Sequence, residues 1–202
     1  MPVETQDATL RFFTIGHSSH QTEHFVALLR QHSIDVVVDT RSAPYSRFTP
    51  QFDREGLKET LTTAGLRYLW MGDVVGGRPR EESCYDGEGR VLYSRVAELA
   101  EFKEAVARLE RGAGEFRVAL LCSEEDPAHC HRRLLISRVL MERGAAIAHI
   151  RGDGSIDTDA DVVAKSGKPL AGAQPALFPE IDESRWRSTG VIGKKAARSA
   201  FD

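Results

Sequence analysis

The chain has 202 residues, of which 41% are hydrophobic and 28% are charged, and its formal net charge is −3 at pH 7. These values are typical of a globular protein with one domain, or a domain and a tail, without a global positive field that would attract nucleic acid. No apolar run approaches the roughly 20 residues that span a bilayer, and the polar, acidic start of the chain is unlike a signal peptide. We therefore expect no membrane partner. The spacing of the three cysteines does not resemble a disulfide framework, which favours a reducing, cytoplasmic setting.

Short β-rich runs alternate with helical patterns along the first 151 residues. Strands are expected at 11–16, 34–38, 66–71, 116–122 and 145–150. Helices with apolar residues at helical spacing are expected between them, at about 22–29, 53–64, 94–111 and 126–143. The alternation predicts a single three-layer α/β domain over residues 1–151, with a mainly parallel sheet of about five strands covered by helices on both faces.

Three local signals refine this prediction. The fourth helix is expected to open with Asp126 as its N-cap and Pro127 at its first position, and Gly112–Gly114 are expected to end the third. The longest irregular stretch, 72–90, is of a length that usually marks a functional lid or a disordered loop. Residues 152–202 change from acidic to proline-rich to basic, which favours an extended C-terminal arm that partly wraps the domain. Leu170, Leu177 and Phe178 are candidates for pinning that arm, and a solvated tail is the alternative.

Reactive side chains gather between Cys122 and Arg133. Two of the three cysteines, two of the seven histidines and the carboxylate of Glu124 fall in this stretch. It joins the fourth predicted strand to the next predicted helix. Because open α/β proteins bind ligands at the carboxyl ends of their parallel strands, we expect a functional site here.

Other predicted strand ends carry similar residues. The carboxyl ends of parallel strands and the first turns of the following helices share one edge of a sheet, so side chains far apart in the sequence meet there. The candidates at this edge are His17 and Ser18, Asp39 and Arg41, Gly76, Gly77 and Arg78, Cys122 and Glu124, and Cys130, His131 and Arg132.

These blocks resemble the signature segments of domain-of-unknown-function family 488. The segments are Thr14–Ser18, Asp39–Pro44, Gly76–Arg78, Leu121–Glu124 and Cys130–Arg132. They occur in the expected order and span roughly residues 11–151. The resemblance implies an α/β domain of bacterial type and indicates that the blocks belong together, but it implies no particular reaction.

Four residues are candidates for catalysis: Asp39, Glu124, His17 and Cys130. Cys130 lies near a predicted helix N-terminus between basic residues, an environment that suits a nucleophile, although a small buried side chain that lines the contact between helix and sheet is the favoured alternative. Asp39 would orient a histidine or act as a general base, or else cap the following turn. Asp39 and Arg41 would point to opposite sides of a continuing strand and would not need to pair. Glu124 is either an acid–base residue or a partner of Arg132.

Arginines and glycines at the same edge suggest anion binding. Arg41, Arg78 and Arg132, with the backbone of Gly76 and Gly77, would hold a phosphate or carboxylate, since guanidinium groups and helix N-termini both favour anions. Ser18 and His131 complete the predicted ligand-binding set. Gly76-Gly77 matches neither the Walker nor the dinucleotide spacing, so no nucleotide cofactor is predicted.

Three functions remain open from the sequence. The first is an enzyme of hydrolysis or group transfer that acts on a small anionic, phosphate-bearing or nucleotide-like ligand. The second is a non-catalytic nucleic-acid or nucleotide binding module, in which Tyr45, Phe48 and Phe52 stack bases. The third is a metal-binding or redox protein that uses Cys122, Cys130 and His131, or His17, although the spacing departs from the Cys-x-x-Cys pairs of structural zinc. No sequence feature assigns an oligomeric state.

Overall fold

A six-stranded sheet with the order β3-β2-β4-β1-β5-β6 forms the centre of the protein, as seen in a computed structural model that describes residues 9–167 and 186–192. The strands are β1 (Arg11–Gly16), β2 (Val36–Asp39), β3 (Arg67–Trp70), β4 (Val118–Cys122), β5 (Ala146–Ile150) and β6 (Ile156–Asp157). Strands β1 to β5 pair in parallel, and β6 adds antiparallel to β5. The predicted α/β class with a mainly parallel sheet is confirmed.

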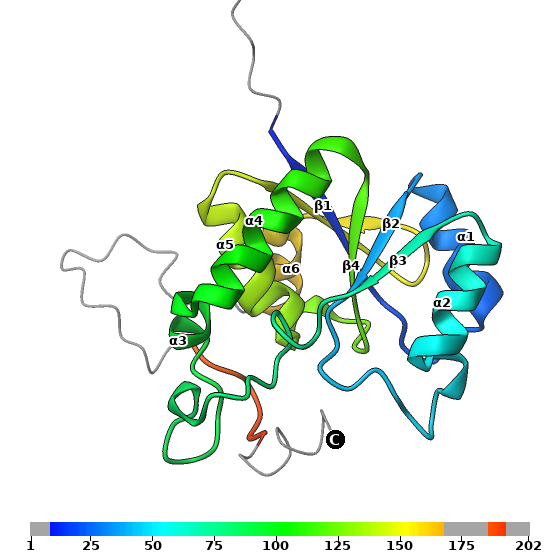
Figure 1. Cartoon of the computed structure of the whole chain (residues 1–202). Helices are drawn as coiled ribbons and strands as arrows, with labels where there is room; N and C mark the ends of the chain where they lie inside the picture. Colours follow the sequence, from blue (N-terminus) through cyan, green and yellow to red (C-terminus); the bar gives the residue numbers. More distant parts are fainter. Residues whose placement is uncertain (1–8, 168–185, 193–202) are drawn as a thin grey trace, which may run out of the picture.

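Helices cover both faces of the sheet (Figure 1). The α-helices are α1 (Thr22–Gln31), α2 (Arg54–Thr63), α3 (Tyr93–Glu98), α4 (Ala100–Glu115), α5 (Arg138–Glu142) and α6 (Asp159–Ser166). Short 3-10 turns are η1 (Pro50–Phe52), η2 (Glu82–Cys84) and η3 (Pro127–His129), and the π-helical turn η4 (Arg132–Ser137) precedes α5. Helices α1 and α2 lie on one face, and α3, α4 and α5 lie on the other.

The two-residue period of the strands divides the core into two layers. Phe12 and Leu120 pack with the side chains of α4 and α5, whereas their neighbours Phe13 and Leu121 pack with those of α1 and α2. Successive side chains of a strand point to opposite faces, so a strand that is apolar at every position is buried on both sides. All five residues of β4 are buried, as expected for a strand inside the sheet.

The helix expected to begin at Asp126 begins later. Asp126 accepts a hydrogen bond from the amide of Ala128, but it caps only the turn η3, and Cys130 then returns to an extended conformation with φ −90° and ψ 141°. The carbonyl of Cys130 accepts from the amides of Arg133 and Leu134, which starts the next helix. Cys130 therefore lies just outside a helix start. Asp126 and Pro127 do cap and open a helical turn as predicted, but the long helix expected from that cap begins only after Cys130.

The long helix expected at 94–111 is divided and extended. Leu99, with φ −60° and ψ 134°, separates α3 from α4. Helix α4 continues through Gly112 and Gly114 to Glu115, so the glycines do not end it. A Cβ atom at either glycine would meet no atom within 4 Å, so these positions face open space.

Part of the segment assigned to the C-terminal arm is regular structure. Residues 156–166 form β6 and α6, and α6 begins with a capping box between Thr158 and Asp161. The buried guanidinium of Arg133 binds the Asp159 carboxylate, with Nε 2.6 Å from Oδ1. Trp186–Ile192, red in Figure 1, runs beside the loop before α3, where Arg187 pairs with Leu92. The pinning residues proposed for the arm, 170, 177 and 178, lie outside the described residues.

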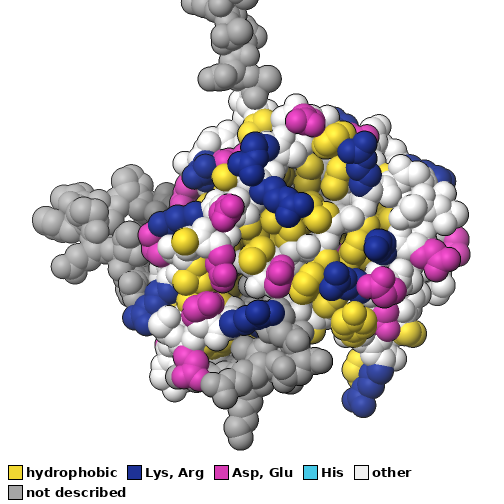
Figure 2. Space-filling view, viewed as in Figure 1, with side chains coloured by type: hydrophobic (Ala, Val, Ile, Leu, Met, Phe, Trp, Pro, Cys, Tyr) yellow, Lys and Arg dark blue, Asp and Glu magenta, His cyan; other side chains and the backbone are white. Residues whose placement is uncertain are grey.

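Two surface properties bear on possible partners. Of the helices in the described ranges, none combines the length and the apolar character needed to cross a bilayer. On the face shown in Figure 2, basic and acidic side chains are interspersed rather than segregated. A broad basic surface of the kind that binds nucleic acid is therefore not seen on that face.

Candidate functional site

The loops that follow β1, β2 and β4 lie side by side at the carboxyl edge of the sheet. The amide of His17 donates to the carbonyl of Cys122 at 3.0 Å, and the amide of Ser18 donates to that of Ser123 at 2.9 Å. On the other side of β4, the amide of Thr40 donates to Leu121 at 3.0 Å. The sheet thus brings together residues that are more than a hundred positions apart in the sequence.

A cavity of about 480 Å³ opens at this edge. Its volume falls within the roughly 300–1,000 Å³ of small-molecule sites. From the strand-end loops and the start of η4 come Arg41, Ser42, Gly77, Arg78, Cys122, Ser123, Glu124, Cys130 and His131, among others. Tyr93 of α3 and the segment Ser188–Gly190 also line the cavity.

Two thiols, a carboxylate and an imidazole converge on one wall of the cavity. Oε2 of Glu124 lies 2.9 Å from Sγ of Cys122 and 3.2 Å from Sγ of Cys130. Nδ1 of His131 lies 3.6 Å from Sγ of Cys122. Glu124 accepts a hydrogen bond from whichever thiol carries a proton. The four side chains form what we call the Cys–His cluster: Cys122, Glu124, Cys130 and His131.

The backbone fixes the orientation of the His131 ring. Nε2 lies 3.0 Å from the carbonyl oxygen of Thr40, and because a carbonyl only accepts, Nε2 must carry a proton and donate. Nδ1 then faces Cys122. The backbone of Gly77 also lies against the ring: a Cβ atom on Gly77 would lie 3.0 Å from Cγ of His131, so a larger residue there would press on the ring.

The members of the Cys–His cluster shift one another's pKa. The hydrogen bond from Cys130 and the charge of His131 outweigh burial and lower the pKa of Cys122 to about 6. Burial and the neighbouring Cys122 raise the pKa of Cys130. Burial opposes ionisation of Glu124, but the hydrogen bond from Cys122 and the charge of His131 lower its pKa to about 2. Unequal proton affinities of this kind are typical of functional sites, although ion-pair networks also produce them.

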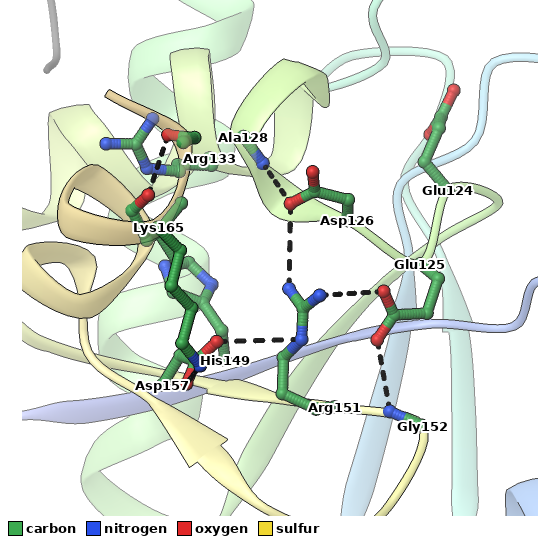
Figure 3. A network of polar contacts seen from close by, with 12 residues as sticks. Glu124, Glu125, Asp126, Ala128, Arg133, His149, Arg151, Gly152, Asp157 and Lys165 are labelled. Carbon is green, nitrogen blue, oxygen red and sulfur yellow. Dashed lines mark hydrogen bonds and ion pairs between the residues drawn. The ribbon is translucent and has the colours of Figure 1, made fainter. Parts of the chain in front are cut away.

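Arg132 and Arg151 hold the loop that carries Glu124. The fully buried guanidinium of Arg132 donates to the backbone carbonyls of Glu124 and Glu125. Arg151 binds the carboxylates of Glu125 and Asp126 from the other side, while Glu124 points away from this network (Figure 3). Arg132 is not among the residues that line the cavity. Arg132 therefore does contact Glu124, as one alternative from the sequence held, but through the main-chain carbonyl and not through the carboxylate.

Asp39 and Arg41 form a buried pair, contrary to the expected opposite orientations. Nε and Nη2 of Arg41 lie 2.9 Å and 2.6 Å from the two oxygens of Asp39, and the hydroxyl of Tyr68 donates to the same carboxylate at 2.7 Å. The expectation of opposite orientations was wrong, because residues two apart in a strand point to the same face, and the chain leaves the strand directly after Asp39. Asp39 is fully buried, and these contacts support a structural role rather than the catalytic one considered from the sequence.

His17 lies behind Arg41 rather than in the cavity wall. Its ring stacks on Phe52, with centroids 4.4 Å apart. Nδ1 donates to the carbonyl of Ser18, so Nε2 accepts from Nη1 of Arg41 at 3.1 Å. Burial, together with the charge of Arg41, lowers the pKa of His17 to about 4. Neither His17 nor Ser18 lines the cavity.

The Gly-Gly-Arg segment contributes close packing and one exposed cation. A Cβ atom on Gly76 would collide with Oγ of Ser42, and that hydroxyl accepts a hydrogen bond from the amide of Arg78 at 3.1 Å. Gly76 itself is outside the cavity, whereas Gly77 and the exposed Arg78 line it. Sequence reasoning did not single out Ser42, although it lies inside the Asp39–Pro44 segment. Tyr93 and Ser188–Gly190 were missed because no local motif marks them and they reach the cavity only through the fold.

Comparison with known proteins identifies a family but no individual relative or solved structure. Residues 21–139 match the family described as "Domain of unknown function DUF488". The chain belongs to this family. The match includes every member of the Cys–His cluster but stops short of Trp186–Ile192. Searches of the curated proteins and of the solved structures found no match.

Proposed function

We propose that this protein is a cytoplasmic enzyme that catalyses hydrolysis or group transfer on a small anionic ligand, phosphate-bearing or nucleotide-like, bound in the strand-end cavity. One observation carries the proposal. The Cys–His cluster and the guanidinium of Arg78 line the same cavity at the carboxyl edge of a parallel sheet. A cation to hold an anion and groups able to move protons are the minimum that such a reaction needs.

Glu124 is the residue best placed for proton transfer. Its side chain lines the cavity, and its backbone is held by Arg132 and by the anchored side chain of Glu125. In hydrolysis of a phosphate ester, Glu124 would accept a proton from a water whose oxygen forms a bond to phosphorus. The bond from phosphorus to the leaving oxygen would break, and that oxygen would receive the proton from Glu124.

Arg78 is the residue best placed to bind the anion. The charge of Arg41 is already matched by Asp39, and Arg132 is occupied by carbonyls, so neither offers an equivalent group to a ligand. Arg78 reaches the cavity from a segment fixed by the hydrogen bond of its amide to Ser42. Guanidinium groups bind phosphate oxygens in a bidentate manner, which also orients the phosphorus.

A thermal-shift screen tests the proposal, with inorganic phosphate, pyrophosphate and nucleoside mono-, di- and triphosphates as probes. A ligand that stabilises the protein should lose that effect in Arg78→Ala and keep it in Arg80→Ala, an exposed arginine outside the cavity. Hydrolysis of the same ligand should fall by about 10²–10⁴-fold in Glu124→Gln, the usual contribution of a general base. Full stabilisation of Arg78→Ala would place the ligand elsewhere, and full activity of Glu124→Gln would remove its role.

A second candidate is a single-stranded nucleic-acid binding module. Tyr45 and Phe48 are 62% and 81% exposed on the loop beside the cavity, and the guanidinium of Arg47 lies 4.8 Å from the Phe48 ring centroid. Phe52, the third predicted base-stacking residue, is buried against the ring of His17, so its ring is not accessible to a base. Binding to oligonucleotides that weakens steeply with salt and is lost in Tyr45→Ala with Phe48→Ala would favour this function over catalysis.

A further inference from the structure

We propose that Cys122, Cys130 and His131 bind a Zn²⁺ ion whose fourth position opens into the strand-end cavity. Sγ of each cysteine and a ring nitrogen of His131 all lie within 4.8 Å of one another. Thiolate sulfur and imidazole nitrogen are the donors that Zn²⁺ prefers. The inference deepens the proposed function, because it names what would activate water there, but metal binding itself does not depend on that function.

The spacing of the donor atoms fits tetrahedral coordination. Bonds of about 2.3 Å to sulfur and about 2.0–2.1 Å to nitrogen at tetrahedral angles place the two donors about 3.5 Å apart. Sγ of Cys122 and Nδ1 of His131 are separated by 3.6 Å. All donor pairs lie within 4.8 Å of one another, so closing onto the ion requires shifts of no more than about 1 Å.

The surroundings of His131 are those of a metal ligand. Histidine ligands almost always donate their other ring N–H to a carbonyl or carboxylate, which fixes the tautomer. Nε2 of His131 makes this bond to Thr40, so the lone pair of Nδ1 is directed toward the sulfur of Cys122. Gly77 packs against the ring and restricts its rotation.

Both cysteine ligands lie in or directly beside regular secondary structure. Cys122 is the last residue of β4, which lies between β1 and β2 in the sheet, and Cys130 immediately precedes the η4–α5 helix. Both thiols are buried, at 3% and 2% exposed, yet both line the cavity. Cys84 shows the contrast, because it packs within an apolar cluster of the core and outside the cavity.

Three protein ligands and an open position are the pattern of catalytic zinc sites, whereas structural sites use four protein ligands. Glu124, whose Oε2 lies near both sulfurs, is then the carboxylate beside the open position. A zinc ion lowers the pKa of a bound water to about 7, which would make the water a nucleophile at neutral pH. Glu124 would accept its proton, as in the hydrolysis described above.

Metal titration of the whole chain, without a histidine tag and in a reductant that does not bind metal, tests the site. The chelator-treated protein should bind one equivalent of Zn²⁺ in competition with a chromophoric chelator. One equivalent of Co²⁺ should give the absorption of a thiolate-bound tetrahedral ion. Affinity should fall by more than about 100-fold in Cys130→Ser and in His131→Gln, because loss of a ligand exceeds the 10–100-fold effect of losing its second-shell partner.

Two control variants distinguish loss of the metal site from a general loss of structure. Cys84→Ala removes a buried thiol elsewhere, and His129→Gln removes a neighbouring histidine that lines the cavity, so both should retain full affinity. Circular dichroism checks that each variant is folded. Absence of the Co²⁺ absorption in the parent protein, or its persistence in folded Cys130→Ser, would overturn the proposal.

Glu124→Gln distinguishes the two proposals from each other. The variant should bind Zn²⁺ within about 10-fold of the parent, because Glu124 is not one of the three ligands. If metal binds but no phosphate-bearing compound stabilises or reacts, the zinc site stands and the proposed substrate class is wrong. If ligands bind to protein that takes up no metal, the zinc site is wrong and the proposed function survives.

Discussion

The guanidinium of Arg41 holds both oxygens of the Asp39 carboxylate, with Nε 2.9 Å from Oδ1 and Nη2 2.6 Å from Oδ2. The two side chains are 5% and 0% exposed. This ion pair fixes the loop after β2 at the point where it turns into the cavity wall. Within the part of the chain that the structure describes, the other side chains and carbonyls that contact the pair are those of Tyr68, Phe52 and His17, and none of them supplies a charge that could replace Asp39 or Arg41.

We expect Asp39→Asn to lower the free energy of unfolding by about 3–5 kcal/mol, because removal of one partner leaves a buried charge uncompensated. Urea denaturation measures the change. Glu98→Gln is the control, since its partner Lys103 lies at a similar 2.6 Å but both side chains are exposed. That substitution should change the free energy by about 0.5 kcal/mol or less. A similar, small effect of both variants would contradict the structural role of the buried pair.

His17 should make stability depend on pH. Burial and the charge of Arg41 lower its pKa from 6.5 to about 4 in the folded protein. Between these values the unfolded chain takes up a proton that the folded protein does not, so the free energy of unfolding falls as the pH falls from 6.5 to 4. The loss contributed by His17 is about 3 kcal/mol. In His17→Gln, which keeps an acceptor for Arg41 but does not titrate, this part of the slope should disappear; equal slopes in both proteins would refute the assignment.

Gly77→Ala should disturb the ring of His131 without unfolding the protein. The added methyl group would lie 3.0 Å from Cγ of the ring, which must then shift from its hydrogen bond to Thr40. Nitrogen NMR of the imidazole should show the Nε2–H form weakened, and Co²⁺ affinity should fall by about 10–100-fold. Gly87→Ala is the control, because no atom lies within 4 Å of its Cβ position. An unchanged His131 spectrum in Gly77→Ala would show that Gly77 does not position the ring.

Gly16→Ala should displace the loop that carries Glu124 into the cavity wall. A Cβ atom at Gly16 would collide with the backbone carbonyl of Glu124 and lie 2.7 Å from Nη1 of Arg132. Overpacking of this kind typically costs about 1–3 kcal/mol, and the displaced loop should also lose its alignment with Cys122. Urea denaturation and the ligand-dependent thermal shift measure the two effects. Gly112→Ala, in open space within α4, should instead leave stability unchanged or raise it by up to about 1 kcal/mol.

The sheet and the convergence of its loops were predictable because each depends on a repeating signal. β4 is apolar at every position, which indicates burial on both faces, and the parallel arrangement then determines which loops share an edge. His17, Asp39, Glu124 and Arg132 do lie at this one edge. Sequence reasoning could not assign them to the cavity or to its support, because that depends on where each side chain points after its strand ends.

Other features depend on contacts that no local pattern reports. The extended conformation of Cys130 moved the helix start away from Asp126, although the Asp-Pro signal was a sound one for a cap. Residues 156–166 were predicted to be the acidic part of an extended C-terminal arm, yet the buried Arg133 supplies Asp159 with a partner and α6 packs beside β5. Ser188–Gly190 reach the cavity from the far end of the chain.

The π-helical turn η4 has a consequence for variation in chain length. Its wider turns accommodate one residue more than a regular helix would, just after His131. Removing a single residue from 132–137 would convert the π-helical turn into a regular helical turn. Because each residue of a helix adds about 100° of rotation, His131 and the residues before it would then rotate about the helix axis by about that angle relative to the residues after the deletion. Leu135 and Leu140 could stay in the core only if His131 swung away from Cys122. The segment should therefore tolerate substitutions of similar shape far better than a deletion.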